Sequence, residues 1–514
     1  MDFDFFVLVT NTFIKYLVPY YMHKFKLFYI HKYLRLICGL VLLQAFSDNT
    51  FAQQSKSKEI DSYIKQRLAN SNIPGLAVAV VHSDTFVLVK GYGKTADDKQ
   101  IGANTPFAIA SLSKAFTAAA VLQLVQAGKI DLDNPVVKYI PAFSINSPLG
   151  KQITVRQVLH QISGMGDTGY PEFNLKKQPQ NLDEVIKNLT SAKLVSEPGK
   201  AFHYHNPNYQ VLAKIVEEVS HEQFSTYLNK HIISPLQMAH TYNAENVSQF
   251  FDNTHHLPQG YIYVLGKPVV TKEPDWFVSG DAGIVSTAAD MAKWLSDQLK
   301  AKGADSSAIL GQKYMAIMQS PPPNSNFTYA MGWHANPQGH VLYHSGIMWT
   351  YSSQQIILTD KGYGIVLLFN GGANMLTDYY SFLEGIKDIV SGQKPSTSSL
   401  PPWLYTTAIV LFLLIILTLG IRRILRVKQW YRNYNKRSAW KTWLYMLIRL
   451  VPIILLLLIP YLVTVFSGRV INMQKITLMY VDVVLVIGLA GVLNLLIVVL
   501  RLIYLAKHKV VTIQ

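Results

Sequence analysis

Short apolar runs at both ends of the first 400 residues predict β-strands. Gly75–Val81 and Phe86–Val89 are apolar and flank the polar pair Ser83-Asp84, which predicts a β-hairpin. Three later runs have the same bounded, apolar character: Val341–His344, Ser352–Leu358 and Gly364–Phe369. A polar turn at 359–362 joins the last two of them.

The segments between these strands carry apolar residues at helical spacing. Pro106–Leu124 leads from a short strand-like stretch into a strongly helical segment, for which Gly128 is a suitable C-cap. A second helix is predicted over Ala288–Leu299, with Thr287 near its cap. Residues 130–270 have a mostly helical pattern with long polar loops. We therefore expect an α/β (α+β) fold, in which helices flank one mainly antiparallel sheet and a helical insertion closes a cleft.

Three long apolar segments follow a Ser- and Pro-rich linker at 393–401. A bilayer core needs roughly 20 apolar residues per helix. Three segments meet this length: Pro402–Ile421, Trp443–Phe466 and Ile476–Leu500. The sequence thus predicts a folded domain at 53–392 and a membrane domain at 402–514. Asp482 and Asn494 lie within the third span, where packing between the three helices is favoured over a transport path.

The positive charge of the chain belongs to the membrane segments. The formal net charge is +16, but residues 53–400 carry 28 Lys and Arg against 27 Asp and Glu, whereas residues 401–514 carry 14 against 1. A nucleic-acid surface needs its basic cluster on the folded domain, so this partner is excluded. The connection Arg422–Lys441 holds eight basic residues and no acidic one. By the positive-inside rule this connection and the C-terminus are cytoplasmic, which puts the folded domain outside.

The N-terminal residues 1–52 have the features of an export signal. Basic residues follow Met22, a possible true start; the run Leu36–Phe46 is apolar, and a small-residue cleavage site precedes Gln53. An uncleaved signal anchor is the alternative, and it leaves the folded domain on the same side. Both predict a multi-pass protein of a bacterial-type cytoplasmic (inner) membrane, with the lipid bilayer as a partner. Cys38 is the only cysteine, which excludes an intrachain disulfide and a cysteine metal cluster.

A serine and a lysine at the start of the Pro106–Leu124 helix are the first candidates for chemistry. Ser111 and Lys114 are three residues apart, so their side chains share one helix face. The first amides of a helix are unpaired and lie at the positive end of its dipole. A hydroxyl with a base one turn away is the layout of a serine acyl-transfer nucleophile. The Ser-x-x-Lys pattern also occurs elsewhere, so the argument depends on its order relative to other motifs.

Ser111…Lys114, Tyr204…Asn206 and His344-Ser345-Gly346, in this order, resemble the three motifs of the penicillin-recognising serine hydrolases. The nearest branch is the class C β-lactamase and D-alanyl-peptidase-like group. Six surrounding strings are similar to the same family: Pro74–Val80, Thr154–Leu159, Gln161–Gly164, Glu197–Gly199, Gly283–Thr287 and Met331–Trp333. The resemblance covers about residues 56–390 and leaves the membrane segments unmatched.

The resemblance implies a role for each motif residue. Ser111 attacks a carbonyl carbon and forms an ester, and Lys114 accepts its proton. Tyr204 shares proton transfer to the leaving group, and the division of labour between Tyr204 and Lys114 stays open. Asn206 orients Lys114 and binds the substrate amide. The oxyanion hole corresponds to the backbone N–H groups of Ser111 and Ile347.

The third motif departs from the β-lactamase pattern. His344, Ser345 and Gly346 correspond to residues that bind and orient the substrate, but β-lactamases usually carry Lys at the first position. Histidine is mostly neutral at pH 7, so we expect a weaker hold on a substrate carboxylate. The bulky residues 347–351 follow where the family has a glycine-rich run, and they narrow the edge of the cleft.

Other classes of site find little support in the sequence. His203 and His205 flank Tyr204, but no third ligand follows at a recognisable spacing, so we predict no metal and no cofactor. We expect a membrane-anchored, exported serine hydrolase that acts through an acyl-enzyme on amides or esters. D-Amino-acyl peptides or esters of the cell envelope are the candidate substrates. A true β-lactamase and a penicillin-binding sensor without turnover are the alternatives, and the oligomeric state is open.

Overall fold

A computed structural model describes residues 54–509 of the chain. Six short gaps interrupt this range: 253–256, 301–306, 324, 374–376, 397–400 and 435–437. The predicted export signal, with Met22 and Cys38, lies outside the described residues, as does part of the predicted linker. Residues 60–514 belong to one unit. Of the preceding unit, residues 54–59 are described and begin a helix that continues to residue 69.

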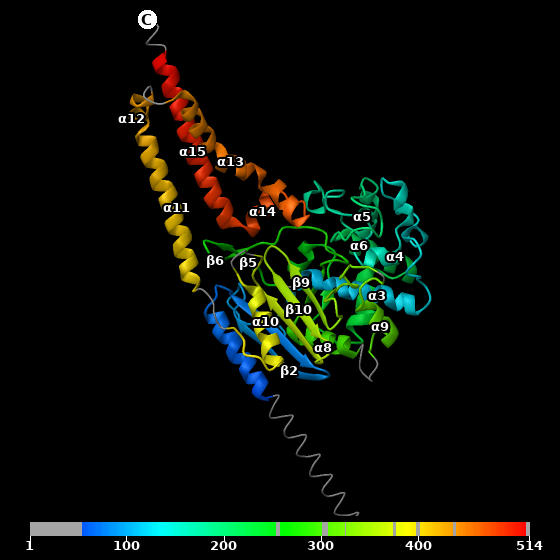
Figure 1. Ribbon diagram of the computed structural model, residues 1–514. Coiled ribbons are helices and arrows are strands. Elements are labelled where there is room, and N and C mark those ends of the chain that lie inside the picture. Colours follow the sequence, from blue (N-terminus) through cyan, green and yellow to red (C-terminus); the bar gives the residue numbers. More distant parts are fainter. Residues whose placement is uncertain are drawn as a thin grey trace, which may run out of the picture. The chain divides into compact units, whose positions relative to one another are not determined.

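Six antiparallel strands form the central sheet, in the order β2-β1-β11-β10-β9-β8 (Figure 1). Their bounds are β1 Gly75–His82, β2 Thr85–Gly93, β8 His334–Ala335, β9 Val341–Ile347, β10 Ser352–Leu358 and β11 Tyr363–Phe369. The predicted hairpin, the three later strands and the antiparallel sheet are confirmed. Because β1 pairs with both β2 and β11, strands from the two ends of the domain are neighbours.

Side chains of β1 alternate between two hydrophobic cores. Leu76, Val78 and Val80 belong to the core that includes α10 (Tyr379–Val390), whereas the alternate positions from Ala77 to Val81 belong to the larger core. Helix α8 (Ala288–Leu299) packs on β1, β2 and β11. Since successive strand residues point to opposite faces, an apolar run is buried on both sides of the sheet. The sheet is thus covered on both faces.

Helix α3 (Ser113–Gln126) runs through the larger core and is buried almost all round, as expected for a helix without a polar face. It packs against α6 (Pro207–Ser220), α7 (Phe224–Leu228) and α9 (Gln312–Met318). The remaining elements of the domain are short: β3 Phe107–Ala108, α4 Val155–Leu159, α5 Leu182–Leu189, β4 Tyr242–Asn243 and β7 Ile284–Ser286. Gly128 has a φ of +71°, which fits its predicted role at the helix end.

The prediction of a mostly helical segment misses one strand pair at its end. Residues Gly260–Val264 (β5) and Lys267–Thr271 (β6) form a hairpin. Its turn residues Leu265 and Gly266 both have positive φ. The backbone N–H groups of these two residues donate to the carboxylate of Asp482, at 2.5 and 3.1 Å. A contact with a residue more than 200 positions away thus holds the turn, which the local pattern could not reveal.

Within the described residues, three helices are long and apolar enough to cross a membrane: α11 Pro402–Leu425, α13 Ala439–Ser467 and α15, which begins at Val481. Helix α15 packs against α11 and α13 (Figure 1). The Arg449 guanidinium donates to the Asn494 amide oxygen at 2.8 Å, which joins α13 to α15 as a packing contact. The shorter helices α12 (Val427–Arg432) and α14 (Met473–Met479) accompany them.

The third span begins five residues later than the sequence suggests. The predicted start at Ile476 is wrong, because α14 ends at Met479 and α15 begins at Val481. Asp482 consequently lies in the first turn of the span rather than inside it. Its carboxylate accepts from the β5–β6 turn and, at 2.8 Å, from the Tyr405 hydroxyl of α11. Asp482 thus packs between two of the three helices, and it also joins them to the β5–β6 turn, which the sequence did not predict.

Candidate active site

Ser111 lies in the 3₁₀ turn Ala110–Leu112, directly before α3. The helix itself begins at Ser113, two residues later than the layout in the sequence suggests. Ala110 has a φ of +49°, a left-handed conformation that a non-glycine residue adopts only when its surroundings hold it. The flanking Ile109 is held by its N–H, which donates to the Ile284 carbonyl at 3.0 Å, and by its own carbonyl, which accepts from Ser353 Oγ at 2.7 Å.

Strand β9 passes directly against this turn, and Gly346 is the point of contact. A Cβ atom added at Gly346 would collide with the Ile109 carbonyl oxygen and the Ser353 hydroxyl. The third motif therefore needs glycine here for close approach of the two backbones, not for a positive φ. This packing sets the position of β9 relative to Ser111.

Lys114 is fully buried and its side-chain nitrogen has three oxygen partners. Nζ lies 3.1 Å from Ser111 Oγ, 2.8 Å from Asn206 Oδ1 and 3.1 Å from the Asp281 carbonyl oxygen. These three contacts fix the position of the nitrogen beside Ser111. The structure thus brings Ser111, Lys114 and Asn206 into one hydrogen-bonded group, although Lys114 and Asn206 are 92 residues apart in the chain.

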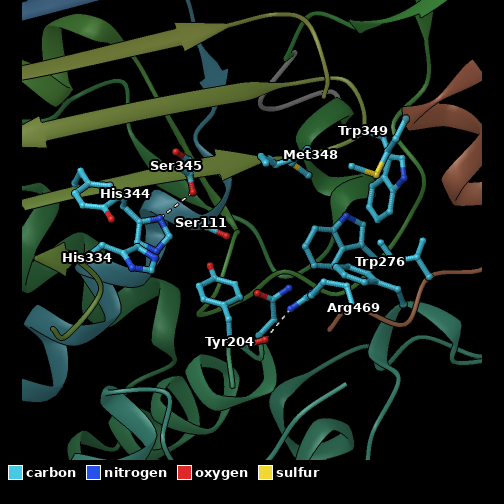
Figure 2. A pocket seen from close by; sticks show the side chains of 15 residues that line it. Ser111, Tyr204, Trp276, His334, His344, Ser345, Met348, Trp349 and Arg469 are labelled. Atoms are coloured by element: carbon cyan, nitrogen blue, oxygen red, sulfur yellow. Dashed lines mark hydrogen bonds between the residues drawn. The ribbon is translucent and has the colours of Figure 1, made fainter. Parts of the chain in front are cut away.

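Gln161 holds the segment that carries Tyr204 and Asn206 through two hydrogen bonds. The Gln161 carbonyl accepts from the His203 N–H at 2.9 Å, and its Oε1 accepts from the His205 N–H at 3.0 Å. Figure 2 shows the Tyr204 hydroxyl pointing toward Ser111. The Lys114 nitrogen lies 4.9 Å from the centre of the Tyr204 ring.

His344 lines the pocket with both ring nitrogens already engaged. Nδ1 lies 2.8 Å from the Ser345 carbonyl oxygen and Nε2 lies 3.2 Å from the Tyr329 hydroxyl. Burial, aided by the nearby His334, lowers the pKa of His344 well below its usual value, so the ring is neutral. The Nδ1 N–H then donates to the carbonyl, and Nε2 accepts from Tyr329. To bind a substrate carboxylate, as the resemblance implies, His344 would have to give up one of these hydrogen bonds.

A pocket of about 360 Å³ opens beside Ser111 (Figure 2). Six residues singled out in the sequence line it: Ser111, Tyr204, Asn206, His344, Ser345 and Ile347. Nine further residues complete the lining: Phe173, Trp276, His334, Tyr343, Met348, Trp349, Arg469, Ile471 and Met479. Sequence reasoning missed most of these, although it flagged the bulky run 347–351 as narrowing the cleft. Lys114 lies beneath the pocket and reaches it through Ser111.

Glu273 forms hydrogen bonds to the bulky run 347–351. Its carboxylate accepts from the Trp349 N–H at 3.0 Å and from the N–H and hydroxyl of Thr350 at 2.8 and 2.5 Å. Complete burial raises the pKa of Glu273 to about 7, although these hydrogen bonds oppose the shift. The sequence gives no signal for this residue, because its partners follow 76 and 77 positions later.

This raised pKa predicts a pH-dependent stability. Because the pKa of Glu273 is higher in the folded chain than its ordinary 4.5, the protonated form favours folding. That contribution is fully present below about pH 4.5 and is lost as the pH rises through 7. We expect the free energy of unfolding of the unsubstituted protein to fall by an amount on the order of 3 kcal/mol between pH 4.5 and 8, and we expect the Glu273→Gln variant to lack this fall. Unfolding of the detergent-solubilised protein across this range measures it. The exposed Glu197→Gln is the control, and equal pH slopes in all three proteins would contradict the assignment.

A buried charged cluster lies beside Tyr204. Ligand atoms of Asp167, Glu172 and His205 lie within 4.8 Å of one another, a set that could hold a metal ion. The two carboxylates thus complete, with His205, a set of metal-ligand atoms that the spacing along the chain did not reveal. The guanidinium of Arg469 lies 3.2 Å from Asp167 and 2.7 Å from Glu172, so a cationic side chain already pairs with both carboxylates. A metal ion would have to displace it, and the absence of a metal stays a prediction.

Known proteins are similar to this chain in sequence. The family model described as Beta-lactamase matches residues 60–379. Protein flp of Staphylococcus aureus (strain MW2) is 29% identical over 419 residues, which cover 79% of this chain and 83% of that protein. Putative penicillin-binding protein PbpX of Bacillus subtilis (strain 168) is 30% identical over 332 residues, which cover 64% of this chain and 77% of PbpX.

Solved structures show the same fold. The octameric penicillin-binding protein homologue from Pyrococcus abyssi superposes with a TM-score of 0.55 at 24% identity, over 66% of this chain and 78% of that one. EstCE1, a hydrolase with promiscuous acyltransferase activity, superposes with a TM-score of 0.56 at 19% identity, over 66% of this chain and 99% of that one.

Proposed function

The chain belongs to the Beta-lactamase family, whose members are generally serine hydrolases, and we propose that it is a membrane-anchored hydrolase that forms an acyl-enzyme on Ser111. The observation that carries this proposal is the Lys114 nitrogen, 3.1 Å from Ser111 Oγ beneath an open pocket. A serine hydroxyl is a weak nucleophile until a base removes its proton. The buried amine is positioned to do so.

The proposed reaction follows from these positions. The lone pair of the Lys114 nitrogen takes the Ser111 proton as Oγ bonds to the substrate carbonyl carbon. The resulting oxyanion accepts hydrogen bonds from the backbone N–H groups of Ser111 and Ile347. The carbon–nitrogen or carbon–oxygen bond of the substrate then breaks, and the leaving group takes a proton from Lys114 or Tyr204. Water hydrolyses the Ser111 ester by the reverse proton path and releases the acid.

The site favours the hydrolysis of ordinary amides and esters over the hydrolysis of β-lactams. The neutral, fully engaged His344 provides no positive charge for the carboxylate of a β-lactam. Trp349 and Met348 fill the edge of the pocket. D-Amino-acyl peptides or esters of the cell envelope are the proposed substrates, with the folded domain on the periplasmic or extracellular side. The similarity to PbpX, named as a putative penicillin-binding protein, keeps acylation without turnover as a second candidate.

Intact-mass measurements on the full chain in detergent test the proposal. The protein is incubated with a fluorophosphonate, with nitrocefin and with D-alanyl peptides and short-chain esters, and any adduct is mapped by peptide. We expect a fluorophosphonate adduct on Ser111 and release of acid from esters or peptides. A β-lactam adduct that persists without any turnover would instead favour the second candidate. The absence of an adduct on Ser111 with every reagent would overturn the proposal.

The Tyr204→Phe variant separates the two proton-transfer roles. An amine leaving group needs a proton, whereas p-nitrophenolate leaves without one. If Tyr204 protonates the leaving group, we expect kcat/KM to fall about 10²- to 10³-fold for amides and less than about tenfold for p-nitrophenyl esters. Equal losses for both substrates would place Tyr204 in the attack step, as the base. Tyr380→Phe, an exposed tyrosine on α10, is the matched control.

A further inference from the structure

The connection between the second and third membrane helices forms one wall of the active-site pocket. Helix α13 ends at Ser467, and α14 occupies Met473–Met479. Three residues of this stretch, Arg469, Ile471 and Met479, line the same pocket as Ser111. A segment that served only as an anchor would not need to line the pocket that contains Ser111. This observation extends the proposed function, on which the inference rests.

Arg469 attaches this wall to the catalytic half of the pocket. Its guanidinium pairs with the buried carboxylates of Asp167 and Glu172 and donates to the Tyr204 carbonyl at 3.1 Å (Figure 2). The next backbone N–H, that of Val470, donates to the same oxygen of Asp167, Oδ2, at 3.1 Å. Because charge-assisted hydrogen bonds are geometrically specific and the guanidinium contacts three different residues, the connection has a fixed position beside Tyr204.

A second attachment lies six residues further along the chain, at Lys475 in α14. Its ammonium donates to the Phe173 carbonyl at 2.8 Å, and its own carbonyl accepts from the Trp349 indole N–H at 3.0 Å. The wall is thus fixed on both sides of Ile471. Phe173 and Trp349 are themselves lining residues, so the same contacts that hold the wall also orient the opposite side of the pocket.

Apolar side chains line the part of the pocket between these two sides. The rings of Phe173, Trp276 and Trp349 pack edge to face, with centroids 5.2, 5.4 and 5.9 Å apart. Ile471 and Met479 line the same space from the membrane domain. Aromatic and aliphatic walls gain from the burial of apolar surface, so this part of the pocket favours an apolar group of the substrate.

We propose that the membrane domain completes the active site and gives it an apolar subsite, so that the preferred substrates are amides or esters bearing an aliphatic chain or aromatic ring next to the scissile bond. Each methylene buried there strengthens binding about fourfold. The three membrane helices then serve specificity as well as anchoring, because they fix the connection that forms this wall.

Chain-length preference in the full protein tests the proposal. The rates of p-nitrophenyl acetate, butyrate and octanoate are compared, together with acetate esters of short and long alcohols. We expect kcat/KM to rise roughly 10²-fold from the shortest to the longest chain in at least one series. The double variant Ile471→Ser/Met479→Ser is expected to reduce that rise at least tenfold, because it lowers kcat/KM for the longest chain more than for acetate. Leu457→Ser, at an exposed position of α13, is the control.

The outcomes separate this inference from the proposed function. Turnover of esters without chain-length preference, or a preference that the double variant retains, would overturn the inference and leave the hydrolase intact. If the protein turns over no ester, binding of unreactive butanamide and octanamide, followed by tryptophan fluorescence, provides the readout. Tighter binding of octanamide that the double variant weakens supports the subsite, and equal binding of both amides overturns it.

Discussion

Alanine in place of Ser111 is expected to abolish acylation of the protein by a fluorophosphonate or β-lactam probe. The hydroxyl oxygen, 3.1 Å from the Lys114 nitrogen, is the atom that bonds to the probe, and alanine has no nucleophilic atom at this position. Loss of a serine nucleophile lowers turnover by about 10⁶-fold in a well-studied serine hydrolase. We therefore expect labelling to fall below detection by in-gel fluorescence and intact mass.

The sequence offers a matched control for this variant. Ser62 also begins a Ser-x-x-Lys pattern, with Lys65 three residues later, but it lies exposed on the helix of residues 54–69. Ser62→Ala is therefore expected to label at the wild-type rate. Retained labelling of Ser111→Ala would refute the assignment of the nucleophile, because the fold and the pocket are unchanged by loss of one hydroxyl.

Methionine in place of Lys114 is expected to slow acylation about 10²- to 10⁴-fold without abolishing it. Methionine fills the same buried volume but has no proton acceptor for Ser111. It also leaves Asn206 Oδ1 and the Asp281 carbonyl without their donor, at a cost of about 1–3 kcal/mol for each buried acceptor. The stopped-flow acylation rate and the unfolding midpoint are measured together, so that lost chemistry is distinguished from lost stability.

Two comparisons make the Lys114 result decisive. Lys129→Met, an exposed lysine just after α3, should leave both the rate and the midpoint unchanged. If Tyr204 were the base, Lys114→Met would lose less than about tenfold in acylation rate and Tyr204→Phe would carry the larger loss for activated esters. The two variants together therefore assign the base.

Much of the fold could be predicted from the sequence because local patterns encode local structure. The apolar run of β1 and the helical spacing of α8 lie in consecutive residues, and the bounds of α8 agree with the prediction. Two of the three membrane helices begin close to the predicted residues. Because bilayer thickness sets the length of a span, a long apolar run is visible in the sequence itself. The resemblance to a known family supplied Ser111 and Lys114 because such motifs keep their order along the chain.

Only the tertiary structure decided what surrounds these residues. Arg469 meets the Tyr204 backbone across 265 positions, and Glu273 supports Trp349 across 76. Neither residue has a local pattern that distinguishes it, because each acts through partners that folding brings near. The start of the third span was misplaced for the same reason: Asp482 is held by the distant β5–β6 turn, and an apolar stretch alone cannot reveal such a partner. Local sequence thus determined the elements and the motif residues, whereas packing between distant segments decided the walls, charges and supports of the pocket.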